Sequence, residues 1–378
     1  MPAASSSAAE PGGPEPAAAG SGAAEPGASE PGAAGSGRSV RAAIVGVAGL
    51  VLGDLERALL RARAPWGFIL FARNCADPDQ VRALVDDLRA TVGRVDAPVL
   101  IDQEGGRVAR LCPPHWSARP PARRLGQLAE RDRSAGIEAT WLHGRLIAAE
   151  LTPLGINVVC APVLDLALPG QTRAIGDRAF ATDPELVGVL GQAMIDGLLA
   201  GGVLPVIKHL PGHGRARRDS HVGLPIVAAA GEELAGADWL PFRACRAVPL
   251  AMTAHVLYPA LDAARPATLS PTIISTVIRG AIGFRGVLVS DDLSMGALSG
   301  SLGARTAAAR AAGCDIALHC NGDVGEMTEV LDAAGPLEGE SAARAEAALA
   351  RVPRLQAFDA PSGEARLTGL LGAIQATA

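Results

Sequence analysis

The chain has 378 residues, of which 49% are apolar and only 3% aromatic, and its formal net charge is −5. This length is enough for one large domain or two ordinary ones, and the apolar share is enough to bury a sizeable core. Lysine and arginine are spread among the acidic residues, so the sequence offers neither the basic face nor the aromatic stacking surface of a nucleic-acid-binding protein.

Apart from Met1, residues 1–37 consist only of Ala, Gly, Pro, Ser and Glu. Such a segment buries too little apolar surface to offset its ordering entropy, which predicts a disordered, low-complexity leader. It lacks the basic start and the apolar run of a signal peptide. The apolar run at 44–53 is shorter than the ~20 residues that cross a bilayer, so we expect no membrane partner.

Six cysteines are scattered along the chain, and no two of them form a CxxC pair. In a chain of this size, that distribution argues against a disulfide framework and favours a reducing compartment. Together with the lack of a signal peptide, it predicts a cytoplasmic protein.

From residue 40 onward, short β-branched runs alternate with stretches rich in Ala and Leu. The runs are almost continuously apolar, which is typical of parallel strands buried on both faces. The intervening stretches include one helix with Asp77 as its N-cap and another with Pro184 at its first position. Eight such units in a row predict an α/β fold, a (β/α)₈ TIM barrel, as a single domain over residues 38–378. The expected strands cover 41–47, 67–72, 98–102, 156–162, 204–209, 250–254, 286–291 and 314–320.

Polar residues end several of these apolar strands. Asp102 ends the third strand, and Lys208 and His209 end the fifth, where a local bulge would bring both toward one side. Asp291 ends the seventh and is followed by Asp292; adjacent strand residues point to opposite sides, so only one of the two, taken as Asp291, is expected to face a site. Because TIM-barrel enzymes carry their chemistry at the C-terminal ends of the strands, this pattern indicates an enzyme.

The segment after the fifth strand places Asp219 two residues before His221. A turn at this spacing lets the carboxylate accept a hydrogen bond from one ring nitrogen of the histidine. Such a partner fixes the tautomer and leaves the other nitrogen free to carry a proton. The pattern is weak by itself, but here it follows KH and PGHG at a strand end, which favours a catalytic pair over a chance one.

Several motifs occur in one order along the chain: IDQEGGRVARL, GDRAF, KHLPGHG followed by DSH, MTAH and GFRGVLVSDDLSM. With these motifs the sequence resembles glycoside hydrolase family 3, and within it the β-N-acetylhexosaminidases of the NagZ type. The resemblance covers about residues 44–321 and implies a retaining enzyme that removes terminal non-reducing GlcNAc from β-linked glycosides. It further implies GlcNAc-anhydroMurNAc muropeptides of peptidoglycan recycling as substrates and a covalent glycosyl-Asp intermediate.

The resemblance also implies residue roles. Asp291 would be the nucleophile and His221 the general acid/base, with Asp219 as its orienting partner. No cofactor and no metal are implied, the partner is a small carbohydrate, and we expect a monomer. The residues that would hold the sugar are Asp102, Arg110, Arg178, Lys208 and His209.

Two other reactions remain open on this fold. A metal-dependent barrel hydrolase would need a zinc site with an open position, which three histidines and a carboxylate could form. A GlcNAc-glycoside phosphorylase is also possible, because a histidine in place of the usual second carboxylate would admit phosphate without charge repulsion. The zinc ligands in the first case would be His209, His213, His221 and Asp291.

Structural roles are the alternative for several of these side chains. Asp102 could cap the loop that follows it, and Arg110 could pair with Glu104, which is itself expected to shape that loop. The arginines between residues 215 and 218 are most simply a solvated face. A bolder hypothesis is that they attract the anionic peptide end of a muropeptide.

Overall fold

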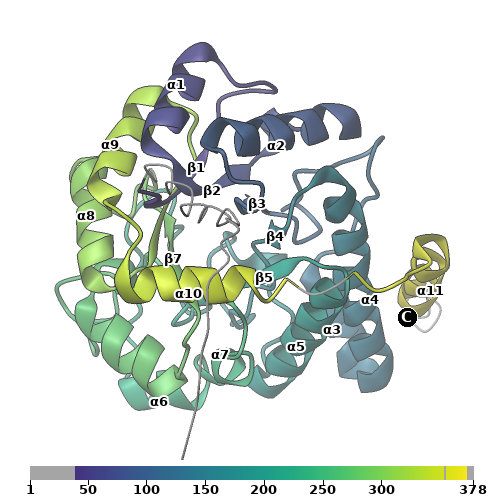
Figure 1. Cartoon of the computed structure of the whole chain (residues 1–378). Coiled ribbons are helices and arrows are strands. Elements are labelled where there is room, and N and C mark those ends of the chain that lie inside the picture. Colours follow the sequence, from purple (N-terminus) through teal and green to yellow (C-terminus); the bar gives the residue numbers. More distant parts are fainter. Residues whose placement is uncertain (1–38, 353–354, 373–378) are drawn as a thin grey trace, which may run out of the picture. The chain divides into compact units, whose positions relative to one another are not determined.

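In the computed structural model, which describes residues 39–352 and 355–372, eight parallel strands close into a barrel (Figure 1). The predicted leader at 1–37 lies outside the described residues. The strands neighbour one another in chain order, and β8 pairs with β1 to close the ring. The predicted TIM barrel is therefore confirmed. The strands are β1 (Arg41–Gly46), β2 (Pro65–Leu70), β3 (Val99–Ile101), β4 (Val158–Val159), β5 (Leu204–Leu210), β6 (Leu250–Thr253), β7 (Val287–Asp292) and β8 (Ile316–His319).

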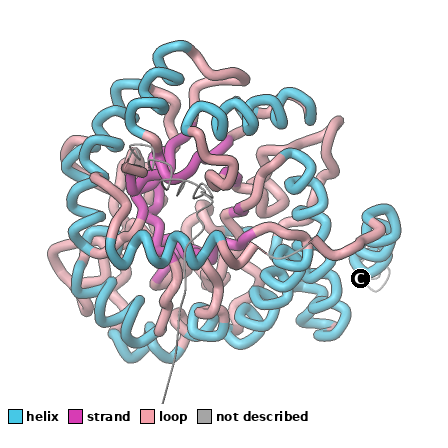
Figure 2. Tube along the Cα trace, viewed as in Figure 1, coloured by secondary structure: helices cyan, strands magenta, loops and turns pink. Residues whose placement is uncertain are grey.

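Helices surround the ring of strands, as Figure 2 shows in cyan around magenta. Helix α2 begins where the sequence predicted, because Asp77 Oδ1 accepts a hydrogen bond from the Gln80 backbone at 2.9 Å. Pro184 opens α5, also as predicted. A π-helical segment, Ile273–Ile282, joins β6 to β7. The α-helices are α1 (Asp54–Arg63), α2 (Pro78–Val92), α3 (Ala122–Arg131), α4 (Arg133–Leu151), α5 (Pro184–Ala200), α6 (Gly231–Gly236), α7 (Leu240–Ala244), α8 (Leu302–Ala312), α9 (Val324–Ala334), α10 (Gly339–Leu349) and α11 (Ala360–Gly372).

Strand β4 is shorter than the predicted 156–162. Pro162 has no N–H to donate, so the regular ladder ends before it. Pairing with β5 nevertheless continues, because the Lys208 backbone donates to the Pro162 carbonyl at 3.2 Å and Leu164 donates to the Lys208 carbonyl at 2.8 Å. The chain that leaves β4 therefore runs beside the end of β5 as far as Leu164.

Two apolar layers hold the barrel. One fills its interior and includes Ile69, Leu100, Val206 and Leu250, all essentially inaccessible to solvent. The other lies between the strands and the outer helices and includes the strand residue Phe68. Neighbouring strand residues alternate between these layers, as the pleat requires, so the interior is a packed core rather than a channel.

The sequence left the place of the C-terminal segment open. Ala345 and Ala348 of α10 pack against the interior layer together with Trp66, at the start of β2, so α10 covers the N-terminal end of the barrel. Figure 1 shows α10 crossing the ring of strands. Helix α11 lies against α4, and an ion pair of 2.6 Å joins Arg366 to Glu138.

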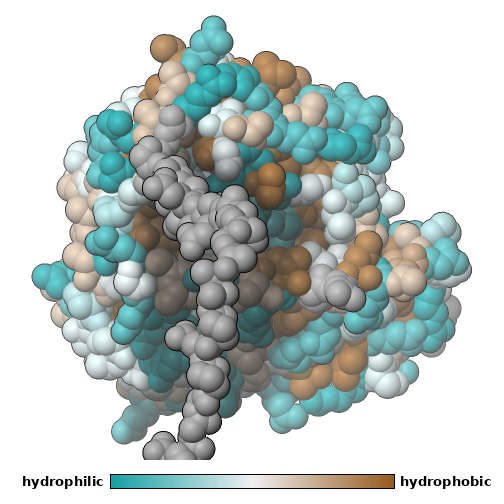
Figure 3. Space-filling model, viewed as in Figure 1, coloured by the Kyte–Doolittle hydropathy of each residue, from teal (hydrophilic) through white to brown (hydrophobic). Residues whose placement is uncertain are grey.

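The outer helices present mainly hydrophilic side chains on the face seen in Figure 3, with hydrophobic residues among them singly or in small groups. Within the described part of the chain, no helix has both the length and the apolar character required to cross a bilayer. Since α10 covers the N-terminal end of the barrel, the polar residues at the C-terminal ends of the strands lie at the opposite end of the barrel from α10.

Candidate active site

A cavity of about 310 Å³ opens at the C-terminal ends of the strands. Its floor is formed by Ile69, Met252 and Leu318, which also belong to the interior apolar layer. Residues that are far apart in the sequence meet here. All eight side chains singled out from the sequence line it: Asp102, Arg110, Arg178, Lys208, His209, Asp219, His221 and Asp291.

Irregular strand ends bring consecutive residues into this cavity. The register between β5 and β6 shifts between Ile207 and Leu210, and Lys208 and His209 both line the cavity. The register between β7 and β8 shifts in the same way before Asp292. Asp292 also contributes to the cavity lining, but both of its carboxylate oxygens are bound: Oδ2 accepts from the Ser294 hydroxyl at 2.6 Å and Oδ1 from the Cys320 backbone at 3.2 Å. Its carboxylate is therefore held by the residues that follow β7 and β8.

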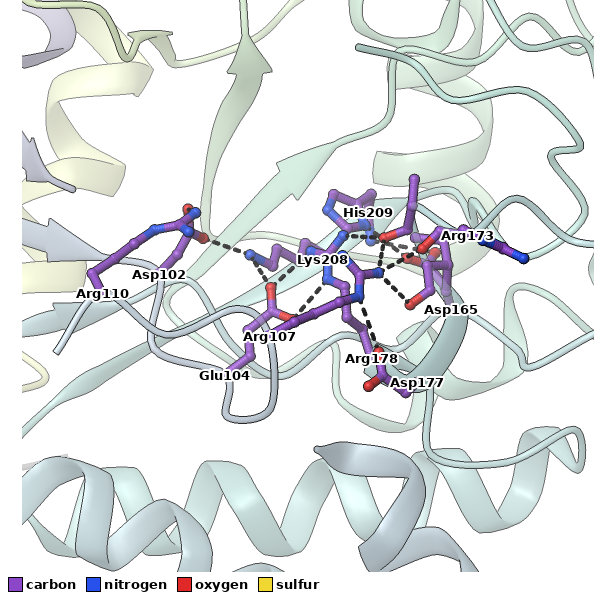
Figure 4. A network of polar contacts seen from close by, with 12 residues as sticks. Asp102, Glu104, Arg107, Arg110, Asp165, Arg173, Asp177, Arg178, Lys208 and His209 are labelled. Atoms are coloured by element: carbon purple, nitrogen blue, oxygen red, sulfur yellow. Dashed lines mark hydrogen bonds and ion pairs between the residues drawn. The ribbon is translucent and has the colours of Figure 1, made fainter. Parts of the chain in front are cut away.

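Four charged residues form one side of the site, which we call the charged wall: Asp102, Glu104, Arg178 and Lys208 (Figure 4). Glu104 and Lys208 are buried, and Asp102 and Arg178 are half-buried. Lys208 Nζ lies 2.7 Å from Asp102 Oδ1 and 2.7 Å from Glu104 Oε1. Arg178 binds the Glu104 carboxylate with two nitrogens, Nε at 2.8 Å and Nη2 at 2.7 Å. Two cations thus clamp two carboxylates in a geometry that fixes all four side chains.

The electrostatics keep every member of the charged wall ionised. Burial by itself raises the pKa of Asp102 and Glu104, but the Lys208 and Arg178 cations outweigh it and hold both carboxyl groups well below their ordinary values. Burial lowers the pKa of the two cations, and the same carboxylates raise them above their ordinary values. Buried charges persist where they are paired in this way.

Arg110 contacts the charged wall from the side. Its Nη2 lies 3.1 Å from Asp102 Oδ2, so it pairs with this carboxylate and not with Glu104 as the structural alternative had it. Glu104 is absent from the cavity lining and lies behind it, in line with the expectation that it shapes the loop. Asp102 does not serve merely as a loop cap, because both of its oxygens bind cations that line the cavity.

A further carboxylate at the site, the buried Asp165, was not identified from the sequence. Its Oδ2 lies 2.7 Å from His209 Nδ1, and its Oδ1 accepts a hydrogen bond from the His213 backbone at 2.5 Å. The imidazole of His209 is thereby fixed in orientation. Burial lowers the pKa of the His213 ring to about 4. The available signal was a carboxylate a few residues beyond the fourth strand, in PVLD.

Another unused signal lies in the composition of the chain. Lys208 is the only lysine, and every other basic side chain with a permanent charge is an arginine. An ammonium is a compact charge that fits between two carboxylates, whereas a guanidinium is larger and planar, so the two are not interchangeable at such a position. This single lysine lies at the cavity, and its side chain is 3% exposed.

Asp291 is the last residue but one of β7 and lines the cavity. In the described part of the chain, its carboxylate accepts one hydrogen bond, from the Asp292 backbone to Oδ1 at 2.9 Å. Burial raises its pKa, but the nearby His255 and His209 and this N–H more than offset burial, so the pKa lies below its ordinary value. Asp291 is therefore an ionised carboxylate with Oδ2 available to a substrate.

Asp219, Ser220 and His221 form what we call the exposed arm of the site. His221 Nδ1 lies 2.8 Å from Asp219 Oδ1, and the His221 backbone donates to the same oxygen at 2.9 Å. The imidazole is 68% exposed. The Ala297 backbone donates to the Ser220 carbonyl at 3.0 Å, which ties the arm to the loop after β7. The pair leaves His221 Nε2 free at the cavity mouth.

The arginines after the PGHG motif do not form a free cationic face. Arg215 binds Asp238 Oδ2 at 2.7 Å and also pairs with Glu233, so its charge is neutralised within the fold. The hypothesis that it attracts an anionic substrate is therefore wrong for Arg215, while Arg217 and Arg218 remain exposed. Within residues 39–352 and 355–372, no three His, Cys, Asp or Glu side chains are grouped so that they could hold a metal ion.

Comparison with known proteins identifies similar sequences. The model of the glycosyl hydrolase family 3 N-terminal domain matches residues 54–355. A beta-hexosaminidase of Aromatoleum aromaticum is 39% identical over 323 residues, which cover 83% of this chain and 88% of the relative. A beta-hexosaminidase of Alkalilimnicola ehrlichii is 42% identical over 282 residues, which cover 74% of this chain and 80% of the relative.

Solved structures share the architecture. NagZ from Neisseria gonorrhoeae, in complex with N-trifluoroacetyl-D-glucosamine, has a TM-score of 0.74 at 32% identity and covers 88% of this chain and 98% of its own. A glycoside hydrolase family 3 beta-N-acetylglucosaminidase from Paenibacillus sp. has a TM-score of 0.77 at 31% identity, with 87% of this chain and 66% of its own covered.

Proposed function

Because the chain belongs to glycosyl hydrolase family 3, we propose that it releases terminal non-reducing GlcNAc from β-linked glycosides with retention of configuration, through a covalent intermediate on Asp291. Its relatives make it a glycoside hydrolase of the β-hexosaminidase type. The assignment of the individual residues rests on the geometry of the site.

The observation that carries the proposal is one cavity lined by an ionised, half-buried carboxylate and by an oriented, exposed imidazole. Retaining hydrolysis needs a nucleophile on one side of the scissile bond and a proton donor on the other. Asp291 has the first character, and the Asp219–His221 pair has the second. Fixed donors and acceptors for sugar hydroxyls are supplied by the residues of this region that line the cavity, Asp102, Arg178, Lys208 and His209.

In the first step, Asp291 attacks the anomeric carbon while the bond to the leaving-group oxygen breaks. His221 donates its Nε2 proton to that oxygen, and Asp219 stabilises the imidazole by accepting a hydrogen bond from Nδ1. In the second step, the neutral Nε2 takes a proton from water, and the water oxygen attacks the anomeric carbon. The Asp291 carboxylate leaves, and GlcNAc is released with its original configuration.

The natural substrate that we propose is a GlcNAc-anhydroMurNAc muropeptide, handled by a cytoplasmic monomer. Two similarities support GlcNAc as the sugar that is released. One structural neighbour is a NagZ in complex with N-trifluoroacetyl-D-glucosamine, and the relatives are beta-hexosaminidases. All six cysteines are free thiols, which agrees with a reducing compartment. Comparing the products formed from muropeptides in phosphate buffer and in phosphate-free buffer separates hydrolysis from phosphorolysis, since only the latter yields GlcNAc 1-phosphate.

Trapping of the intermediate tests the proposal. A 5-fluoro GlcNAc donor slows the second step, so the glycosyl-enzyme should accumulate and peptide mapping should place the label on Asp291. The Asp291→Asn variant is the matched control and should stay unlabelled. His221→Ala should still be labelled by a donor with a good leaving group. A label on any other residue would refute the assignment.

A further inference from the structure

Residues 172–178, between β4 and α5, form part of the cavity wall. Ala174, Ile175 and Arg178 line the cavity from this segment. The short helical turn Gly176–Arg178 is its one piece of regular structure. Within the segment, the Ile175 backbone donates to the Thr172 carbonyl at 3.2 Å and the Arg178 backbone donates to the Ile175 carbonyl at 3.0 Å. The carbonyls of Arg173 and Ala174 accept hydrogen bonds from arginine side chains instead.

Arg107 holds this backbone from the loop after β3 (Figure 4). Its Nη2 lies 2.6 Å from the carbonyl oxygen of Arg173 and 2.8 Å from that of Ala174. The carbonyl of Ile175 lies 3.2 Å from the same nitrogen, and Nε donates to Asp177 Oδ1 at 3.1 Å. One guanidinium thus reaches three consecutive carbonyls and a carboxylate. Two nitrogens of the guanidinium make these contacts, Nη2 to the carbonyls and Nε to the carboxylate. A lysine has a single nitrogen, so it could not bind the carbonyls and Asp177 from two positions at once.

The same contacts connect Arg107 to Arg178. The Ala174 carbonyl accepts a hydrogen bond from Arg178 Nη1 at 2.9 Å as well as from Arg107, so the two guanidinium groups share one acceptor. The segment also touches the loop that leads to the exposed arm, because the Thr172 backbone donates to the Ala216 carbonyl at 2.8 Å. A shift of this backbone would therefore displace the Arg178 side chain, which belongs to the same segment and binds the same carbonyl.

We propose that Arg107 is a positioning residue, which holds residues 172–178 against the barrel so that Arg178 stays in the orientation that binds the sugar. This rests on the proposed function, which assigns Arg178 to the sugar. The Arg107 side chain is 47% exposed, so its removal leaves no hole in the core. Its effect is exerted through the backbone that it binds.

A double-mutant cycle tests whether Arg107 acts through Arg178. Arg107→Ala should raise KM for an aryl β-GlcNAc glycoside about tenfold and change kcat less than about threefold. Adding the same substitution to Arg178→Ala should raise KM by less than about twofold, because the residue that it positions is already gone. Arg107→Lys should keep most of the defect, since it restores the charge but not the fork.

Arg82→Ala is the matched control. The Arg82 side chain is also 47% exposed and pairs with one carboxylate, Asp79, but it lies on α2 and does not line the cavity. Its KM should equal that of the unchanged protein. A rise in KM with this variant equal to that of Arg107→Ala would reduce the effect to a loss of surface charge and overturn the proposal.

The peptide bond after Arg173 gives a readout that needs no catalysis. Trypsin cuts after arginine and lysine, Arg173 is exposed, and its carbonyl is the one that Arg107 binds at the shortest distance. Under native conditions, cleavage after Arg173, followed by mass spectrometry, should be about tenfold faster in Arg107→Ala than in the unchanged protein and in Arg82→Ala.

The two proposals fail separately. If Arg107→Ala and Arg178→Ala are additive and cleavage after Arg173 is unchanged, Arg107 contacts the sugar itself and the positioning role is wrong. If Arg178→Ala leaves KM unchanged, the sugar role of Arg178 in the proposed function is wrong, whatever the rate of cleavage.

Discussion

The charged wall and the exposed arm place ionisable groups around one cavity in opposite physical states. Glu104 and Lys208 in the wall are 6% and 3% exposed, and each side chain binds at least two partners. His221 in the arm is 68% exposed and has one side-chain partner. Groups that hold a sugar benefit from fixed positions in a water-poor site. A group that gives a proton and takes it back has to meet both the leaving group and water, so it belongs at the mouth.

The largest effect is expected at Asp291, which both regions serve. Asp291→Ala should lower kcat/KM by roughly 10⁴-fold or more on every glycoside, whatever its leaving group, because no carboxylate remains to form the intermediate. Added azide should restore turnover of an aryl glycoside and give the α-glycosyl azide, since it enters from the face that Asp291 occupied. Activity within about a hundredfold of the original would show that another group is the nucleophile.

Removing a charge from the wall should cost stability as well as activity. Lys208→Met leaves Asp102 and Glu104 buried without their shared cation, and the free energy of unfolding in urea should fall by about 3–5 kcal/mol. His221→Ala, measured alongside, should change it by less than about 0.5 kcal/mol, because the imidazole is exposed. An equal fall in the free energy of unfolding of the two variants would contradict the difference in burial between the charged wall and the exposed arm.

Lys208→Arg sharpens the same point. It keeps the charge, and arginine is the basic residue used everywhere else in the chain. A guanidinium is too large for a site that encloses the ammonium within 2.7 Å of two carboxylates, so we expect KM for aryl GlcNAc to rise at least about tenfold. An active variant with an unchanged KM would mean that only the charge matters.

In the arm, the effect should depend on the leaving group. His221→Ala should lower kcat by about 10²–10⁴-fold for glycosides whose leaving alcohol needs a proton. It should be far less harmful for aryl glycosides with acidic phenols, which leave unprotonated. A series of phenols of graded acidity measures this directly. The same loss across the series would exclude the acid role.

The smallest effect is expected in the pH dependence of stability. The pKa values of Asp102 and Glu104 are depressed in the folded state, so their stabilisation is fully present above the ordinary carboxyl values near 4. It is lost as the pH falls through the depressed folded values. Thermal unfolding followed from pH 6 to pH 2 should show a weaker dependence in Glu104→Gln. An identical slope in both proteins would contradict the shift.

The barrel and the residues at its strand ends could be predicted because continuous apolar runs and their polar termini are local features of the sequence. The partners of the Asp292 carboxylate could not be predicted, because one of them, the Cys320 backbone, follows a different strand. Asp165 was missed because its two partners, His209 and His213, come from another strand end. Arg107 could not be assigned because its acceptors are backbone carbonyls, which carry no sequence signature.

The apolar floor of the cavity determines how substrate enters and how products leave. Ile69, Met252 and Leu318 close the cavity toward the barrel interior, and α10 covers the far end. In the reaction proposed above, only the terminal sugar would enter this closed cavity, so chains would be shortened by one terminal sugar at a time. Entry and exit then share one mouth. The aglycone has to leave before water arrives, and the freed monosaccharide leaves last and competes with the next substrate.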